Sequence, residues 1–383
     1  MAPIYLDHSA STPMHPEVIE AMLAYMRDHY GNASSVHSFG RAAKRALSEA
    51  RDQIAQQLHC QSNELVFTGG GTESDNTALF GAASAMRGIK KHIITSSVEH
   101  HAVLHTCNQL ERMGYEVSFV SVDSTGQVDV NEIEAAIRPD TFLISIMYGN
   151  NEVGTLQPIE PIGELARARG ILFHVDAVQA LGMTRLDLDE LPVDLMSFSS
   201  HKINGPQGVG ALYVSRRANI DPLLFGGLQE RKRRAGTENI AGIIGFAKAV
   251  QLVASNIAEH ARHLTELREA MLRLLRESLG ADRVVVNGHP TEHLPHILNV
   301  SFPDVPTETM LMNLDMEGIA ASSGSACTSG SLEVSHVLVA MKLPEPVLRS
   351  AVRFSFGLGN TMKDVEIAAQ KIATIVERIR KKN

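Results

Sequence analysis

Residues 195–202 read Leu-Met-Ser-Phe-Ser-Ser-His-Lys, an apolar run that ends in polar side chains. A short run of this kind is typical of a strand buried on both faces of a sheet. Similar runs recur through the first two-thirds of the chain, and amphipathic helical patterns separate several of them. The runs are 65–67, 92–95, 117–120, 142–147, 171–175, 195–198 and 209–214, and the helical patterns include 73–86, 101–113 and 159–169. The alternation predicts an α/β fold with a mainly parallel, doubly wound sheet and helices on both faces.

The pattern changes near residue 253. A long charged helix is predicted over 260–279, and a smaller α+β region follows it. Its predicted strands are 284–286, 297–302 and 352–356, and its closing helix is 363–380. We therefore expect a large domain over 15–254 and a small domain made of 1–14 and 255–383, with the first residues folded back onto the small domain.

Length and composition narrow the function classes. A chain of 383 residues predicts two or three domains at roughly 150 residues each. Charged residues make up 20% and hydrophobic residues 44%, which is typical of a globular protein and excludes a disordered one. The formal net charge of -8 argues against general nucleic-acid binding, because phosphates attract Lys and Arg. The one basic run, Arg231 to Arg234, is short and we expect a solvated loop there.

The cysteines indicate a reducing environment. The three residues, Cys60, Cys107 and Cys327, are an odd and sparse set, so they predict neither a disulfide framework nor a metal site. The N-terminus lacks the basic and apolar regions of a signal peptide, and no apolar stretch approaches the roughly 20 residues of a membrane span. From this we expect a cytoplasmic protein.

A glycine-rich turn, Gly69-Gly70-Gly71-Thr72, follows the run 65–67 and opens a helical pattern. Backbone N–H groups and the positive end of a helix suit a phosphate. The spacing matches neither the Walker A motif nor the dinucleotide fingerprint. On this motif alone, a tight turn with Thr72 as the helix N-cap is an equally good interpretation.

A carboxylate and a lysine follow two other predicted strands. Asp176 ends the run 171–175, where a buried charge is costly without a cationic partner, and Gln179 would share its face if a helix follows. Lys202 ends the run 195–198, where partial desolvation would free its amine to form a Schiff base. Taken singly, Asp176 as a helix N-cap and Lys202 as a surface lysine are the plainer alternatives.

Together the three features favour a cofactor site. Ligands of such sheets bind outside the carboxyl ends of the strands. Pyridoxal 5'-phosphate has a phosphate, a pyridine nitrogen that prefers an anionic partner and an aldehyde that reacts with a lysine. The phosphate turn, the carboxylate and the lysine therefore predict a pyridoxal-phosphate enzyme.

The sequence resembles the group I cysteine desulfurases of the NifS/IscS type. The resemblance covers nearly the whole chain and is carried by specific motifs. These motifs are 5–7, 31–37, 71–74, 99–103, 150–154, 174–179, 199–206, 234–239, 322–329 and 353–355. The family belongs to the class V aminotransferases, so the resemblance implies a fold-type I architecture, like that of aspartate aminotransferase, and pyridoxal 5'-phosphate as cofactor.

The resemblance also implies a role for individual residues of the cofactor site. Lys202 would attach covalently to the cofactor, Asp176 would pair with the pyridine nitrogen, and His100 would stack on the ring and act as acid and base. Thr237 would reach the phosphate of a neighbouring subunit, which implies a homodimer. The remaining cofactor contacts would be made by Gly71, Thr72, Ser199 and His201 at the phosphate and by Asn151 and Gln179 at the ring oxygen.

The implied reaction converts L-cysteine to L-alanine. Arg353, with Asn151, would bind the substrate carboxylate through a two-pronged hydrogen bond. Cys327 would attack the substrate sulfur and carry it as a persulfide to an acceptor protein, such as an iron–sulfur scaffold or another carrier. IscS-type relatives continue past the position of Asn383 with a tail that helps to dock the scaffold, so the acceptor is left open.

Residues 320–331, around Cys327, are all small and none can anchor a core, which predicts a mobile loop; a tight turn with an incidental cysteine is the alternative. Cys60 and Cys107 lie in helical patterns, and we expect inert, partly buried thiols there. Three rival functions are weighed. The Ser-rich loop around Cys327 argues against a selenocysteine lyase and an aminotransferase of the same fold. The set of Lys202, Asp176 and Cys327 argues against a catalytically silent scaffold.

Overall fold

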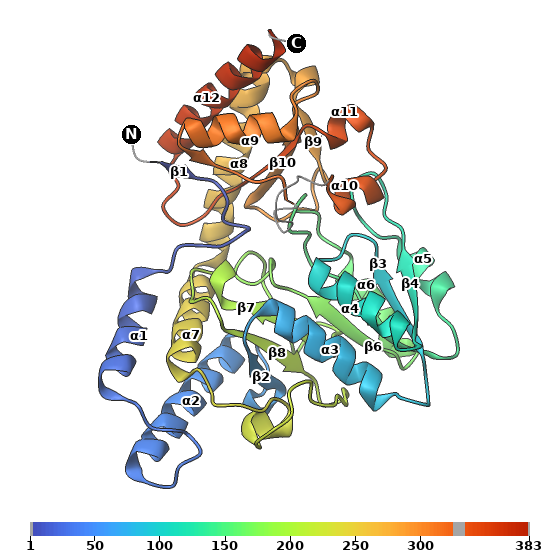
Figure 1. Ribbon diagram of the computed structural model, residues 1–383, viewed down its shortest axis with the longest axis vertical. Helices are drawn as coiled ribbons and strands as arrows, with labels where there is room; N and C mark the ends of the chain where they lie inside the picture. Colours follow the sequence, from blue (N-terminus) through green and yellow to red (C-terminus); the bar gives the residue numbers. More distant parts are fainter. Residues whose placement is uncertain (1–2, 325–333, 382–383) are drawn as a thin grey trace.

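A seven-stranded sheet forms the centre of the larger part of the chain. The computed structural model describes residues 3–324 and 334–381 (Figure 1). The strand order is β2 (Leu65–Thr68), β8 (Gly210–Val214), β7 (Leu195–Ser199), β6 (Leu172–Asp176), β5 (Thr141–Ser145), β3 (His92–Ser96) and β4 (Glu116–Val120). Only β8 runs against the others, because it pairs antiparallel with both β2 and β7. The predicted α/β fold with a mainly parallel sheet is confirmed.

Helices pack on both faces of this sheet because successive strand side chains point to opposite sides. On one face, Ile93 and Leu143 pack with side chains of α3 (Gly71–Ala85) and α4 (His101–Arg112). On the other face, their neighbours Ile94 and Ile144 pack with α6 (Ile159–Ala168) and α7 (Ile240–Ser255). The helices α1 (Pro16–Asp28), α2 (Ser38–Gln57) and α5 (Val130–Ala136) complete this part.

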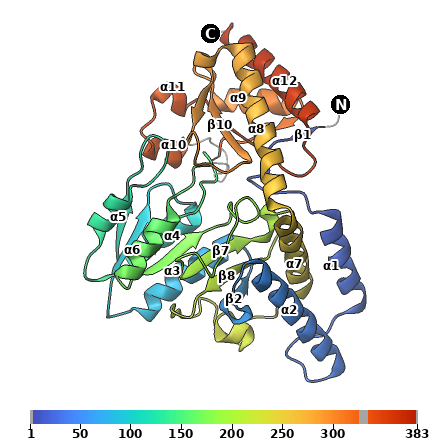
Figure 2. The same cartoon turned by 180° about the vertical axis from the view of Figure 1, so that it is seen from behind.

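The smaller part is built on an antiparallel sheet of β12 (Ala351–Ser355), β10 (Ile297–Ser301) and β9 (Val285–Asn287). The long helices α8 (Ile257–Leu279) and α12 (Met362–Arg380) pack together beside it, as the two views show (Figures 1 and 2). The shorter helices are α9 (Thr307–Met316), α10 (His336–Ala340) and α11 (Glu345–Leu348).

The N-terminus crosses to this smaller part. Strand β1 (Ile4–Tyr5) pairs in parallel with β11 (Ile319–Ala320), and Ile4 and Leu6 belong to the same buried cluster as α8 and α12. By contrast, Val337 and Leu338 of α10 pack with the core of the larger part. The exact domain boundaries stay a prediction.

The elements differ from the predicted ones mainly at their ends. The helix expected over 260–279 begins at Ile257, and α1 and α2 had no counterpart in the prediction. Cys60 lies in the turn after α2 and not in a helix, so that expectation is wrong. Among the described residues no single helix is long and apolar enough to span a membrane, although α7 and α8, bent by 78° between them, would pass that test as a pair.

Candidate active site

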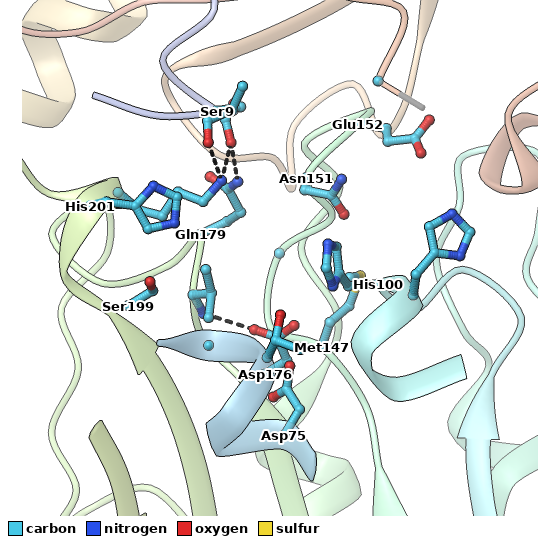
Figure 3. A pocket seen from close by; sticks show the side chains of 18 of the residues that line it. Ser9, Asp75, His100, Met147, Asn151, Glu152, Asp176, Gln179, Ser199 and His201 are labelled. Carbon is cyan, nitrogen blue, oxygen red and sulfur yellow. Dashed lines mark hydrogen bonds between the residues drawn. The ribbon is translucent and has the colours of Figure 1, made fainter. Parts of the chain in front are cut away.

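One cavity of about 400 Å³ gathers most of the expected site residues (Figure 3). Its lining includes Gly71, Thr72, His100, Asn151, Asp176, Gln179, Ser199, His201, Lys202 and Arg353. The topology of the sheet explains why these residues lie close together. Strand β8 is antiparallel to β2 and β7, so β2, β6 and β7 all run the same way and end at one edge of the sheet. The residues that follow these three strands therefore meet there.

The glycine turn after β2 lies close to its neighbours. A Cβ atom on Gly71 would come within 2.6 Å of Val178 Cγ2, and one on Gly210 would come within 2.8 Å of Gly70 Cα. Gly70 has a φ of 146° and is the N-cap of α3, with no side chain capping the helix. The alternative of Thr72 as N-cap is therefore wrong, and the N–H groups of the first turn have no side-chain cap to bind.

The same turn opens on a second hollow, whose lining includes Gly70, Gly71, Thr72, Ser199 and His201. Four of these residues, all but Gly70, also line the main cavity, so the two spaces meet at the N-terminus of α3. A phosphate placed there would receive backbone N–H groups and the positive end of a 15-residue helix.

Lys202 follows β7 in a short 3-10 turn, η2 (Ser200–Lys202), and is half-buried. Its Nζ donates to the carbonyl oxygens of Ser9 and Ala10, the latter at 2.9 Å, so the N-terminal segment holds the amine over the cavity. The alternative of a solvated surface lysine is not what the structure shows.

Asp176 ends β6 and is buried at the floor of the cavity, where its Oδ1 accepts from the N–H of Val178 at 2.9 Å. Burial raises the pKa of Asp176 to about 6, while the charge of Lys202 lowers it. A turn and not a helix follows, so the helix N-cap alternative and the shared helical face with Gln179 are both wrong.

Gln179 still reaches the cavity, but through other partners. Its Nε2 donates to the carbonyl oxygen of Ser9 at 2.9 Å, and its Oε1 lies 3.3 Å from His296 Nε2. Ser9 therefore accepts hydrogen bonds from both Gln179 and Lys202 (Figure 3). The N-terminal segment thus ties together two side chains that come from different strand ends.

His100 is the N-cap of α4, and its Nδ1 accepts from the N–H of Ala102 at 3.1 Å. Burial, and then the charge of Lys202, lowers the pKa of His100 to about 4. The ring is therefore neutral at pH 7 with its proton on Nε2, the nitrogen that stays available for acid and base work.

Arg353 is buried on β12 and is already engaged within the protein. Its Nη1 donates to the carbonyl oxygen of Asn151 at 2.7 Å, and its Nη2 donates to Asp7 Oδ1 at 2.8 Å. Its Nε is buried and has no hydrogen-bond partner among the described residues. These two bonds use two of the five guanidinium N–H donors, so donors remain for a carboxylate that enters the cavity.

The cavity does not include every expected residue. Thr237 is exposed in the segment before α7 and does not line it. Cys327 lies outside the described residues. The other two thiols are buried to different degrees, Cys107 fully and Cys60 partly, and burial raises the pKa of each to about 12. That is the behaviour of inert thiols.

Sequence reasoning missed several residues that line or support the cavity. Asp75 and Glu152 are buried carboxyl groups in its wall, and Asp7 holds Arg353. The rings of His101 and His336 lie against each other in the same wall, with their centroids 4.6 Å apart. These residues stand within or beside the quoted motifs, but their chemistry depends on which segments meet in space.

The residues present fit pyridoxal phosphate. A half-buried lysine amine, a buried carboxylate and a helix N-terminus without a side-chain cap line one cavity. Within the described ranges, no three His, Cys, Asp or Glu side chains are placed to hold a metal ion.

Comparison with known proteins gives a consistent result. The family model of Aminotransferase class-V matches residues 4–367. The chain is 49% identical to the "Cysteine desulfurase IscS" of Methanosarcina thermophila over 98% of this chain and 93% of that protein. Among solved structures, a "NIFS-LIKE PROTEIN" is similar with a TM-score of 0.92 and 36% identity, over 98% of this chain and 100% of that one. "SspA in complex with cysteine" is similar with a TM-score of 0.79 and 36% identity, over 92% of this chain and 98% of that one.

Proposed function

The chain belongs to the class V aminotransferase family, with relatives of the NifS/IscS type, and from that premise we propose that it is a cysteine desulfurase that converts L-cysteine to L-alanine. The observation that carries the proposal is the meeting of Lys202, Asp176 and Arg353 in one cavity. The first two suit pyridoxal phosphate and the third suits the carboxylate of an amino acid.

The cofactor would be held at both ends. The N-terminus of α3, with Thr72, Ser199 and His201, would bind its phosphate, and Asp176 would face its pyridine nitrogen. Gln179 and Asn151 would contact the ring oxygen. When bound, pyridoxal phosphate supplies an electron-withdrawing ring that stabilises negative charge on the substrate carbon next to the amine.

The protein side chains would then bind substrate and move protons. Arg353 binds the substrate carboxylate, with Asn151 beside it. Lys202 Nζ, which lines the cavity, would accept and return the proton of the substrate carbon. His100 is neutral, so its Nε2 can donate a proton and take one back without leaving a buried charge.

The sulfur would leave on a thiol. A sulfur atom removed from cysteine as an S⁰ equivalent needs a nucleophilic acceptor, and we assign that role to Cys327 by its place in the family motif. Its thiolate would attack the substrate Sγ, break the Cβ–Sγ bond and keep the sulfur as a persulfide. Burial of Cys60 and Cys107 supports this choice, because a pKa near 12 leaves almost no thiolate at neutral pH.

A sulfur-acceptor protein would take up the persulfide sulfur, which places the enzyme in iron–sulfur cluster assembly or another sulfur-transfer route. The exposed position of Thr237, away from the cavity of its own chain, supports a homodimer in which it contacts the partner's phosphate site. The sparse cysteines support a reducing, cytoplasmic location.

The test is product analysis with purified protein and added pyridoxal phosphate. We expect a yellow protein that releases alanine and, with a thiol reductant, sulfide in equal amounts from L-cysteine. A protein that turns over only with a keto acid would be an aminotransferase, and one that acts only on selenocysteine would be a selenocysteine lyase. A protein that stays colourless would be a silent scaffold.

A further inference from the structure

Asp75 is a buried carboxyl group in the cavity wall to which the reaction above gives no role. It lies on α3, one turn after the phosphate-binding turn, and only 1% of its surface is exposed. Asp75 and Asp176 both line the cavity and interact electrostatically, and Figure 3 draws Asp75 below Asp176. Its Oδ1 has no hydrogen-bond partner among the described residues.

The groups around Asp75 offer it no cation. His174 on β6 is the one described side chain at ion-pair distance, with its Nε2 3.6 Å from Asp75 Oδ1. That ring lies between two hydroxyl groups, Ser145 Oγ at 2.8 Å and Ser197 Oγ at 3.0 Å. Burial lowers the pKa of His174 to about 3, so the imidazole is neutral.

The other charged groups that face Asp75 are acidic. Asp176 faces it from the end of β6, and Glu99 faces it from the segment after β3. The hydroxyl group of Ser197, on β7, interacts with the carboxyl. Burial first, then the charge of Asp176, raises the pKa of Asp75.

Two adjacent buried carboxyl groups cannot both ionise at low cost, so one of them holds the proton. Asp176 is the better anion, because it accepts a hydrogen bond from the N–H of Val178 and faces the Lys202 charge. Asp75 lies deeper and has neither. The proton therefore belongs on Asp75.

We propose that Asp75 is a positioning residue that stays a neutral carboxylic acid and leaves Asp176 as the single anion under the cofactor ring. The neutral acid fills buried space next to Asp176 without adding a second charge, so the negative charge stays on Asp176. This role rests on the proposed function, since it acts through Asp176. An ionised Asp75 would instead add a second negative charge beneath the ring.

The first test compares two substitutions in the full-length chain by titration with pyridoxal phosphate. Asp75→Asn keeps the shape, the neutrality and a hydrogen-bond donor, whereas Asp75→Ala leaves a cavity and an unsupported Asp176. We expect Asp75→Ala to weaken cofactor binding about tenfold or more and Asp75→Asn to restore it to within about threefold of the wild type. An asparagine variant as weak as the alanine variant would show that a negative charge is needed at this position and would overturn the proposal.

The second test needs no cofactor and no turnover. A carboxyl group whose folded pKa lies above its unfolded value binds a proton more tightly in the folded chain, so it lowers stability as the pH rises from about 4. One such proton changes the unfolding equilibrium at most about tenfold per pH unit. Glu99 and Asp176 also make the folded chain less stable as the pH rises, in the wild type and in the variant. The test therefore compares the free energy of unfolding in urea of the wild type with that of Asp75→Asn between pH 5 and 8.

We expect the asparagine variant to gain stability over the wild type steadily as the pH rises. Parallel curves would mean that Asp75 is ionised in the folded chain throughout this range and would overturn the proposal. This comparison stands even if the chain fails to bind pyridoxal phosphate, so failure of the proposed function and failure of the role of Asp75 can be told apart.

Discussion

The two halves of the cavity are built in different ways. In the cofactor half, the glycine turn, Asp176 and Lys202 each follow a strand of one sheet, so their positions are set by the strands themselves. In the substrate half, Arg353 on β12 is held by Asp7, 346 residues away in the chain. The cofactor half is built on the strand ends of one sheet, and the substrate half joins side chains from the two ends of the chain. Substitutions in the first half should remove chemistry and keep the fold, whereas substitutions in the second should change affinity or stability.

Lys202→Ala should have the largest effect. Turnover should be abolished because no other amine lies at the end of β7, yet cofactor should still bind non-covalently through the α3 turn and Asp176. Borohydride treatment, which fixes an imine, followed by mass spectrometry should show covalent cofactor on the wild type alone. Covalent cofactor on another lysine of the variant would show that this half is not organised around Lys202.

Cys327→Ser should separate cofactor chemistry from sulfur transfer. The variant should keep the visible absorption of the bound cofactor, because the cofactor half is untouched, and should release almost no alanine or sulfide from cysteine. Cys60→Ser and Cys107→Ser are the controls and should stay near wild-type activity, since both thiols are unionised at neutral pH. Mass spectrometry of the wild type should find a persulfide on the peptide with Cys327. Normal alanine release by Cys327→Ser would disprove the sulfur-transfer mechanism and leave the cofactor half intact.

Arg353→Ala probes the substrate half. Charge-assisted hydrogen bonds contribute about 1.5 to 3 kcal/mol each, so the variant should weaken cysteine binding at least about tenfold. Arg353→Lys should restore only part of the affinity for cysteine. A lysine ammonium is a point charge and cannot reproduce the paired hydrogen bonds of a planar guanidinium. The measurement is the apparent KM for cysteine together with the melting temperature. Loss of stability with an unchanged KM in both variants would mean that Arg353 serves only its ion pair with Asp7.

Sequence reasoning reached the cofactor half because strand ends carry a local signal. An apolar run followed by Asp176 or Lys202, and a glycine turn before a helix, can be read without knowing which strands are neighbours, and the parallel sheet then brings them together. The contacts of Ser9 with Lys202, Asp7 with Arg353 and Asp75 with Asp176 carry no such signal. Each joins segments from different parts of the fold, so only the packed structure shows them.

Local sequence patterns gave the wrong helix N-caps at two positions. The N-cap alternative for Asp176 required a helix after it, but Asp176 Oδ1 accepts from the N–H of Val178 and closes a turn instead. Likewise Thr72 has the right chemistry for an N-cap, yet the cap is Gly70, two residues earlier, and Thr72 lies inside α3. Residues that suit both a cap and a ligand site cannot be assigned by type, because the deciding factor is where the backbone turns.

Asp7→Asn should show how far the substrate half depends on its distant partner. Removing one charge from a pair in which the Arg353 side chain is 3% exposed leaves that charge poorly compensated. We expect a loss of about 1 to 3 kcal/mol in the free energy of unfolding. Added L-alanine, which brings a new carboxylate, should raise the melting temperature of the loaded variant more than that of the wild type. As a control, Glu17→Gln breaks an exposed pair with Lys248 and should change neither quantity measurably. Equal ligand shifts in Asp7→Asn and wild type would mean that Asp7 and the ligand act on Arg353 independently.

Glu152→Gln should have the smallest effect. It tests whether alanine formation can be slowed while cofactor binding stays unchanged. The Glu152 carboxylate accepts from Ser335 Oγ at 2.5 Å, and a Cβ on Gly324 would come within 2.7 Å of Glu152 Oε2. Gly324 and Ser335 precede and follow Cys327 in the sequence, and both lie close to this one buried carboxyl group. Glutamine keeps the size and one acceptor oxygen but turns a charge-assisted hydrogen bond into a neutral one, at a cost of about 1 kcal/mol.

We therefore expect Glu152→Gln to lower the rate of alanine formation about threefold to tenfold while the visible absorption of the bound cofactor stays that of the wild type. Ser335→Ala removes the same hydrogen bond from the other side, and the double variant should be no worse than the more severe single one, because both changes break one contact. Fully additive losses in the double variant would show that the two residues act separately. In that case Glu152 would act through its close approach to Gly324 and not through this bond.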